Sequence, residues 1–244
     1  MEVPIPYSRT LDDPFDKWTY ENVMSMVDAV RAEGRYVGTG HPRLFLREDN
    51  IDSVRQKIAT YFIDWMQELV NYVDENYGKD LGLDGWTNYP LAHDVVLLEA
   101  FIYRLGAIPG VKYGHDIDEY ARDGIRHMLS DNMLNGEYRN HQYFMGLPLG
   151  YDWLFDYAGN GAMTEADRTL IAAALLDYAQ PDNMKISAYN SPGGYRLLGA
   201  LAIHGDPYVP AQEVDRTLNY FYHGMVFGNT DEEGMDAQIS GLKN

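Results

Sequence analysis

The sequence predicts an all-α fold in which short turns join successive helices into antiparallel hairpins. Apolar residues recur at helical spacing in several segments after residue 48, and turns rich in Gly, Pro and Asn separate these segments. No segment shows a convincing strand pattern. Hairpins in succession give either a bundle or a curved α/α array, and no fixed sequence period favours a standard solenoid.

Composition favours one large domain. The chain has 244 residues, of which 45% are hydrophobic, so it can bury a sizeable core. We expect residues 41–244 to form this main body and residues 1–40 to form an arm packed on it, with a helix over 20–32. The absence of cysteine excludes disulfides and thiolate chemistry. No apolar run approaches the roughly 20 residues needed to span a bilayer.

The helices are predicted in chain order. A strand-like segment, His41–Leu46, leads into the first helix of the main body. The next apolar stripes are Ile51, Val54 and Ile58; Phe62, Trp65, Met66, Leu69 and Val73; Val95, Leu98, Ile102 and Leu105; and Ile117, Tyr120, Ala121, Ile125 and Met128.

Three further helices are predicted. Thr164 and Asp167 have the spacing of a capping box and predict the start of a helix that ends before Pro181. Its expected buried stripe is Ala166, Leu170, Ile171, Ala174, Leu175 and Tyr178. The next helix runs from near Gly194 to a stop at Gly205, and the last covers roughly residues 212–226.

The net charge of the chain disfavours anionic partners. The net charge is −18, from 19 basic and 37 acidic residues, so neither nucleic acid nor an anionic membrane is expected as a partner. An anionic polysaccharide would also be repelled unless the arginines concentrate in one groove or salt screens the remaining charge.

The histidines do not predict a metal site. No two of the seven share a helix at ligand spacing with a carboxylate partner. We expect surface or ordinary core positions for His93, His115, His127 and His223, and a helix-capping role for His204.

Four segments together resemble the heparinase II/III-like polysaccharide lyases. They are HPRLFLREDNIDSVRQKI from His41, LEAFIYRLGAIPG from Leu98, the segment YDWLFDYAGNGAMTEADRTLIAAALLDYA from Tyr151, and YNSPGGYRLLGALAIHGDP from Tyr189. The resemblance covers roughly residues 40–228 and depends on the order and spacing of the segments. It implies an incomplete α/α toroid and the cleavage of a uronate-containing polysaccharide by β-elimination, a step that needs no metal or organic cofactor.

The resemblance also implies roles for particular residues. β-Elimination requires neutralisation of the uronate carboxylate, a base for the C5 proton and an acid for the leaving oxygen. Asn190 lies where the family places its carboxylate neutraliser, although relatives often follow it with His or Trp where this chain has Ser191. The proposed proton-transfer groups are His141 and Tyr195, and the proposed substrate contacts are Arg139, Tyr189 and Arg196. The structural alternatives are a turn-forming Asn190, a helix-terminal His141 and a surface Arg139.

The family pattern is incomplete here. Its catalytic Tyr normally follows a Gly-rich acidic segment like residues 231–234, but no Tyr follows Tyr222, and the family's β-sandwich has no counterpart. The resemblance therefore implies the N-terminal part of a larger lyase, inactive by itself if that Tyr is essential.

The first residues lack a signal-peptide pattern. We expect a periplasmic or secreted protein whose leader is not in this sequence, with a cytoplasmic location as the alternative.

Two other functions compete with the lyase. A glycoside hydrolase on an α/α barrel would use two carboxylates, for which Asp152 and Asp156 are candidates on one helix face. A non-catalytic helical domain that binds carbohydrate is the other, and the abundance of tyrosine, 20 residues, would supply aromatic platforms for sugar rings.

Overall fold

The computed structural model describes residues 40–81, 89–135, 145–179 and 193–218. The chain divides into two compact units, one of Val37–Tyr222 and one that combines Met1–Tyr36 with His223–Asn244. All described residues belong to the first unit. Nearly all of the predicted N-terminal arm, and the end of the last predicted helix, lie outside the described residues.

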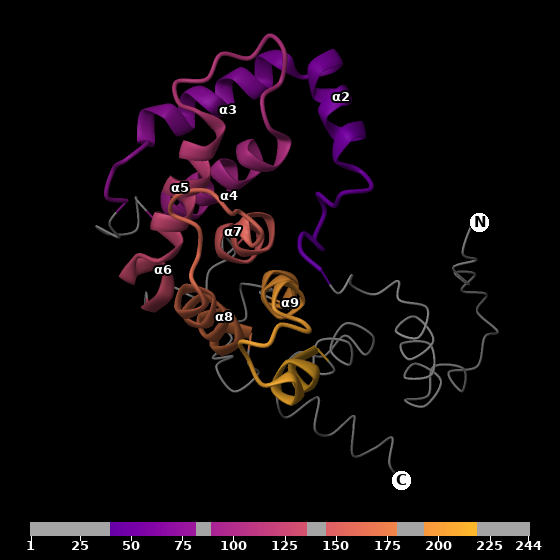
Figure 1. Ribbon diagram of the computed structural model, residues 1–244, viewed down its shortest axis with the longest axis vertical. Helices are drawn as coiled ribbons and strands as arrows, with labels where there is room; N and C mark the ends of the chain where they lie inside the picture. Colours follow the sequence, from indigo (N-terminus) through magenta and orange to yellow (C-terminus); the bar gives the residue numbers. More distant parts are fainter. Residues whose placement is uncertain (1–39, 82–88, 136–144, 180–192, 219–244) are drawn as a thin grey trace, which may run out of the picture. The chain divides into compact units, whose positions relative to one another are not determined.

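The regular secondary structure of the described residues is all helical, with eight labelled helices and no strand (Figure 1). The helices are α2 (Ile51–Tyr61), α3 (Ile63–Asn76), α4 (Tyr89–Leu105), α5 (Ile117–Met128), α6 (Asp131–Asn135), α7 (Gly146–Leu154), α8 (Glu165–Ala179) and α9 (Gly193–Ala202). Residues 211–218 are helical as well. This confirms the all-α prediction, whereas the toroidal arrangement stays a prediction. Within the described ranges, no helix is both long and apolar enough to cross a membrane.

Helix α4 lies at the centre of the packing. It contacts α2, α3, α5 and α7, and its side chains Val95, Ala100 and Ile102 are fully buried. Helix α7 is buried along its whole length and approaches α4 closely. A Cβ added at Gly146 would lie only 2.3 Å from the carbonyl oxygen of His93, so glycine is what allows this approach.

Helix α8 begins at the predicted cap. The Thr164 backbone N–H donates to Asp167 Oδ2 at 2.8 Å, and the Asp167 N–H donates back to Thr164 Oγ1 at 3.2 Å. This reciprocal pair satisfies N–H groups that the first helical turn leaves without intrahelical partners. The predicted capping box is confirmed. Helix α9 packs on α7 and α8, and Gly205, with φ +81°, lies beyond its end as expected.

Two helices expose apolar residues that were predicted to be buried. Phe62 and Trp65 were expected in the core, but they are 53% and 49% exposed, and α3 instead buries Met66, Val70 and Val73. The side of α3 that is covered is the one in contact with α2 and α4. In α8, Leu170 is likewise 55% exposed. Both stretches carry apolar residues around more than one face, so periodicity did not decide which face is buried.

Candidate functional site

The residues predicted for β-elimination cannot be placed relative to one another. Arg139, His141, Tyr189 and Asn190 lie outside the described residues. Tyr195 and Arg196 belong to the first turn of α9, and their side chains are not described. These six assignments therefore stay predictions.

The first polar cluster that the structure does describe is centred on Asp152 of α7. Its carboxylate accepts hydrogen bonds from the backbone N–H groups of Arg43, at 3.0 Å to each oxygen, and of Leu44, at 2.8 Å. His41 Nδ1 lies 2.7 Å from the same carboxylate, and Trp153 donates its indole N–H to the Leu44 carbonyl at 2.9 Å. The HPRL segment is thus held against α7 by main-chain and side-chain bonds together.

Asp206 closes this cluster from the turn after α9. Its carboxylate lies 3.1 Å from His41 Nε2 and accepts hydrogen bonds from Arg43 and Tyr151, both at 2.8 Å. Arg43 also donates to the His204 carbonyl. Asp152, Arg43 and Asp206 are all less than one-tenth exposed. The buried charges balance when His41 is protonated, because two carboxylates then face one guanidinium and one imidazolium.

The electrostatics of His41 agree with this balance. Burial alone would lower the pKa of His41, but its hydrogen bonds to Asp152 and Asp206 outweigh burial and raise that pKa above its usual value. For Asp206, burial acts to raise the pKa, while His41 and Arg43 hold it below the usual range. Burial next to Asp206 raises the pKa of the Tyr151 hydroxyl. The directions of the shifts at His41 and Asp206 both favour the charged forms of these two side chains.

This arrangement corrects one expectation for the hydrolase alternative. Asp152 lies in α7, which ends at Leu154, so Asp156 lies outside the helix. Asp152 is buried and occupied by His41, Arg43 and Leu44, while Asp156 is exposed. The two carboxylates do not share one helix face, and Asp152 has no exposed oxygen to offer a substrate.

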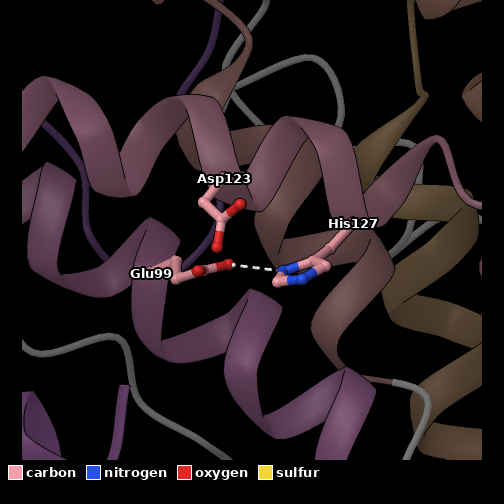
Figure 2. A group of neighbouring side chains, drawn as sticks. All are labelled: Glu99, Asp123 and His127. Atoms are coloured by element: carbon pink, nitrogen blue, oxygen red, sulfur yellow. Dashed lines mark hydrogen bonds and ion pairs between the residues drawn. The ribbon is translucent and has the colours of Figure 1, made fainter. Parts of the chain in front are cut away.

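A second cluster joins α4 to α5. Glu99 of α4 points between Asp123 and His127, which lie one helical turn apart on α5 (Figure 2). Each residue offers one ligand atom, and the three atoms lie within 4.8 Å of one another. A Cβ at Gly124 would lie 3.1 Å from Leu154 Cδ1 of α7 and 3.4 Å from Glu99 Cβ, so glycine mainly leaves room for the Leu154 side chain.

The hydrogen bonds of this cluster orient its three side chains. Glu99 Oε2 lies 3.1 Å from His127 Nδ1, and His127 Nε2 lies 3.1 Å from the Lys79 carbonyl oxygen. Asp123 accepts from the Gly78 N–H at 2.8 Å and from Arg126 Nε at 2.7 Å. Glu99 Oε1 is buried and has no hydrogen-bond partner, and the carboxyl groups of Glu99 and Asp123 can share a hydrogen bond only when one of them is protonated.

Burial and charge shift the pKa values of this cluster, and the shift is largest for Glu99. Burial is the main cause that raises the pKa of Glu99 to about 8, against the opposing effect of His127. The pKa of His127 is raised, because its contacts with Glu99 outweigh its burial. A buried group whose pKa is strongly shifted beside a specific charged partner marks a candidate functional site.

The sequence did not predict this cluster, because it contains a single histidine and its third member comes from another helix. His127 was expected to be an ordinary surface or core residue, yet its side chain is 4% exposed and paired with a fully buried Glu99. One signal was present in the sequence, since Asp123 and His127 have the i, i+4 spacing that puts two ligands on one helix face. Glu99 gave no such signal, because it comes from another helix.

Comparison with protein-family models, with curated proteins and with solved structures gave no match to this chain.

Proposed function

We propose that this chain is the helical domain of a polysaccharide lyase that cleaves a uronate-containing anionic polysaccharide by β-elimination. The observation that supports the proposal is that hydrogen bonds, two of them buried and one part-buried, join the four segments on which the resemblance depends. They are far apart in the sequence, so their contact indicates that they act as one structural unit.

The contacts between these segments are specific. Trp153 of the third segment bonds the Leu44 carbonyl of the first, and Arg43 bonds Asp206 of the fourth. The second segment joins through Arg104, whose Nε donates to the Leu46 carbonyl at 3.4 Å. A fixed junction of this kind would hold α7 and α9 in register, and α9 carries two of the predicted site residues.

The chemistry follows from the predicted roles. The Asn190 amide would neutralise the uronate carboxylate and stabilise the negative charge that develops when the C5 proton leaves. His141 and Tyr195 would transfer protons, while Arg139, Arg196 and Tyr189 would bind the sugar acid. The proposal includes a toroidal arrangement of the helices and a periplasmic or secreted location.

The test is an elimination assay on the whole chain. β-Elimination creates a C4–C5 double bond, so alginate, ulvan and glycosaminoglycans are each incubated with the protein and followed by near-ultraviolet absorbance. If Tyr195 takes the role of the family's later Tyr, we expect absorbance to rise with one of them, and Asn190→Ala to abolish the rise, a loss on the order of 100-fold or more. The control variant is Asn160→Ala, which changes an exposed asparagine.

The other outcomes separate the competing functions. New reducing ends without absorbance would identify a hydrolase and contradict the proposal. Full activity of Asn190→Ala, in a protein that keeps its helical circular-dichroism spectrum, would remove Asn190 from the site.

A second function, carbohydrate binding without catalysis, is favoured by one exposed feature. Tyr61, Phe62 and Trp65 at the α2–α3 junction are between 49% and 75% exposed, and Phe62 and Trp65 line a surface depression. Exposed aromatic faces are amphipathic contact surfaces suited to sugar rings. The nearby exposed Asp64 and Glu68 favour neutral sugars over uronates there.

This second function has its own test. The chain is run in gels loaded with neutral or anionic polysaccharide. We expect Trp65→Ala to weaken retardation in the neutral gel, with Leu170→Ala as the control because Leu170 is an equally exposed apolar residue on another helix. Equal retardation of the wild type and Trp65→Ala would exclude this platform.

A further inference from the structure

We propose that Glu99, Asp123 and His127 bind one divalent transition-metal ion of the zinc type, which links α4 to α5. This inference is independent of the proposed lyase activity, because none of the three residues is among those predicted for β-elimination. It rests on the donor set, on the partners of each donor and on burial.

The donor set suits such an ion. One imidazole nitrogen and two carboxylates are common zinc ligands, and this mixture of nitrogen and oxygen is less suited to calcium or magnesium, which prefer oxygen alone. The three ligand atoms lie within 4.8 Å of one another. Small side-chain movements would bring them to the roughly 2.0–2.2 Å metal–ligand distances of a zinc site.

Glu99 supplies the observation that points to a ligand. Its side chain is fully buried and lies between Asp123 and His127, yet Oε1 has no hydrogen-bond partner in the described structure (Figure 2). A buried carboxylate oxygen without a partner is costly. A metal held by both oxygens of Glu99 would satisfy Oε1 and complete four ligand atoms.

The outer partners of the ligands also fit. A metal-binding histidine usually donates its second ring N–H to a carbonyl or carboxylate, which leaves the other nitrogen free to bind. His127 Nε2 faces the Lys79 carbonyl at 3.1 Å and Nδ1 faces Glu99. Asp123 is oriented in the same manner by the Gly78 N–H.

One cation already lies beside the cluster. Arg126 bonds Asp123 and also lies 2.7 Å from His127 Nε2, a contact that competes with the tautomer that a metal needs. The Arg126 side chain is 47% exposed and reaches the Lys79 carbonyl at 3.1 Å, so it can leave the imidazole without losing every partner. Arg126 is thus the group that the metal would displace.

The test is zinc binding by the full chain after treatment with EDTA. We expect calorimetry and metal analysis to give one zinc ion per chain and a higher Tm with zinc than without it. Glu99→Gln should weaken binding by more than the roughly 10–100-fold that loss of an outer partner costs. The matched control is Glu119→Gln, which changes a more exposed acid in the first turn of α5 and breaks the surface pair of Glu119 with His115.

Glu99→Gln keeps the shape of a protonated glutamic acid, so circular dichroism is expected to show the wild-type fold. A second measurement needs no variant at all. Anomalous diffraction at the zinc edge, on wild-type crystals grown with zinc, should place a peak among the three side chains. Three results would overturn the proposal. They are zinc binding that Glu119→Gln abolishes and Glu99→Gln keeps, an anomalous peak only at other residues, and no zinc uptake by the wild type.

Discussion

At the scale of single residues, His41 is a buried side chain surrounded by charged partners. Its two ring nitrogens face Asp152 and Asp206, its ring stacks on Phe155 with centroids 3.8 Å apart, and Arg43 approaches the same nitrogen as Asp206. The His41 side chain is only 2% exposed. Removing one partner from such a buried charged group leaves the other charges without compensation.

His41→Gln is therefore expected to lower the free energy of unfolding by about 3–5 kcal/mol at pH 6, the typical cost of breaking a buried pair. The folded-state pKa of His41 is raised above its usual 6.5, so its contribution is complete below about pH 6.5 and is lost as the pH rises through the folded-state pKa. Urea unfolding at several pH values should show the difference between wild type and variant shrinking above neutrality.

The control for this prediction is His115→Gln, which removes a less buried histidine near Glu119. Other shifted groups, including His127 and Glu99, are present in both proteins and cancel in the comparison. A stability difference that grows with pH would contradict protonation of His41.

The contacts that form the two clusters could not be predicted from the sequence, because each cluster joins residues that lie far apart in it. His41 and Asp152 are 111 residues apart, and His41 and Asp206 are 165 apart. A local pattern has no information on such contacts. The segments that carry the family resemblance contain these three residues, but the resemblance implies no role for them.

At the scale of elements, the helices were predictable because their signals are local. Apolar spacing and the Thr164 cap place α3, α5 and α8 close to where the structure has them. The buried faces of α3 and α8 were predicted less well, since a face is decided by which neighbour covers it. Trp65 and Leu170 show this, because both fit an apolar stripe and both are exposed.

The contact between α4 and α7 gives a prediction at this scale. Gly146→Ala is expected to lower the free energy of unfolding by about 1–3 kcal/mol, because the new Cβ would lie 2.3 Å from the His93 carbonyl oxygen. A backbone atom in a packed helix cannot move away as a side chain can. Thermal unfolding followed by circular dichroism measures the loss.

A matched substitution should act in the opposite direction. Gly199 lies within α9, and a Cβ there would make ordinary contacts, the nearest 3.5 Å from the Leu175 carbonyl oxygen. Gly199→Ala is expected to stabilise the protein by roughly 0.5–1 kcal/mol, because alanine loses less backbone entropy in a helix. Destabilisation by both substitutions to a similar extent would mean that close approach at Gly146 is not the cause.

At the scale of the whole molecule, the charge and the proposed substrate oppose each other. A net charge of −18 repels an anionic polysaccharide at long range, although a few arginines in a cleft can still bind it at short range. Salt weakens the long-range repulsion more than the short contacts, since the Debye length falls from about 30 Å at 0.01 M to about 8 Å at 0.15 M.

If the chain is a lyase, its kcat/KM on an anionic polysaccharide is therefore expected to rise between 0.01 and 0.15 M salt, roughly tenfold if steering dominates. Initial rates from the absorbance assay, at substrate concentrations below KM, measure this directly. Retardation by a neutral polysaccharide provides the comparison, because contacts of Trp65 with uncharged sugars respond little to salt. A kcat/KM that falls over this range would instead mean that attraction outweighs the net charge, which would require a basic groove. Arg139→Gln and Arg196→Gln would then be expected to remove the salt dependence.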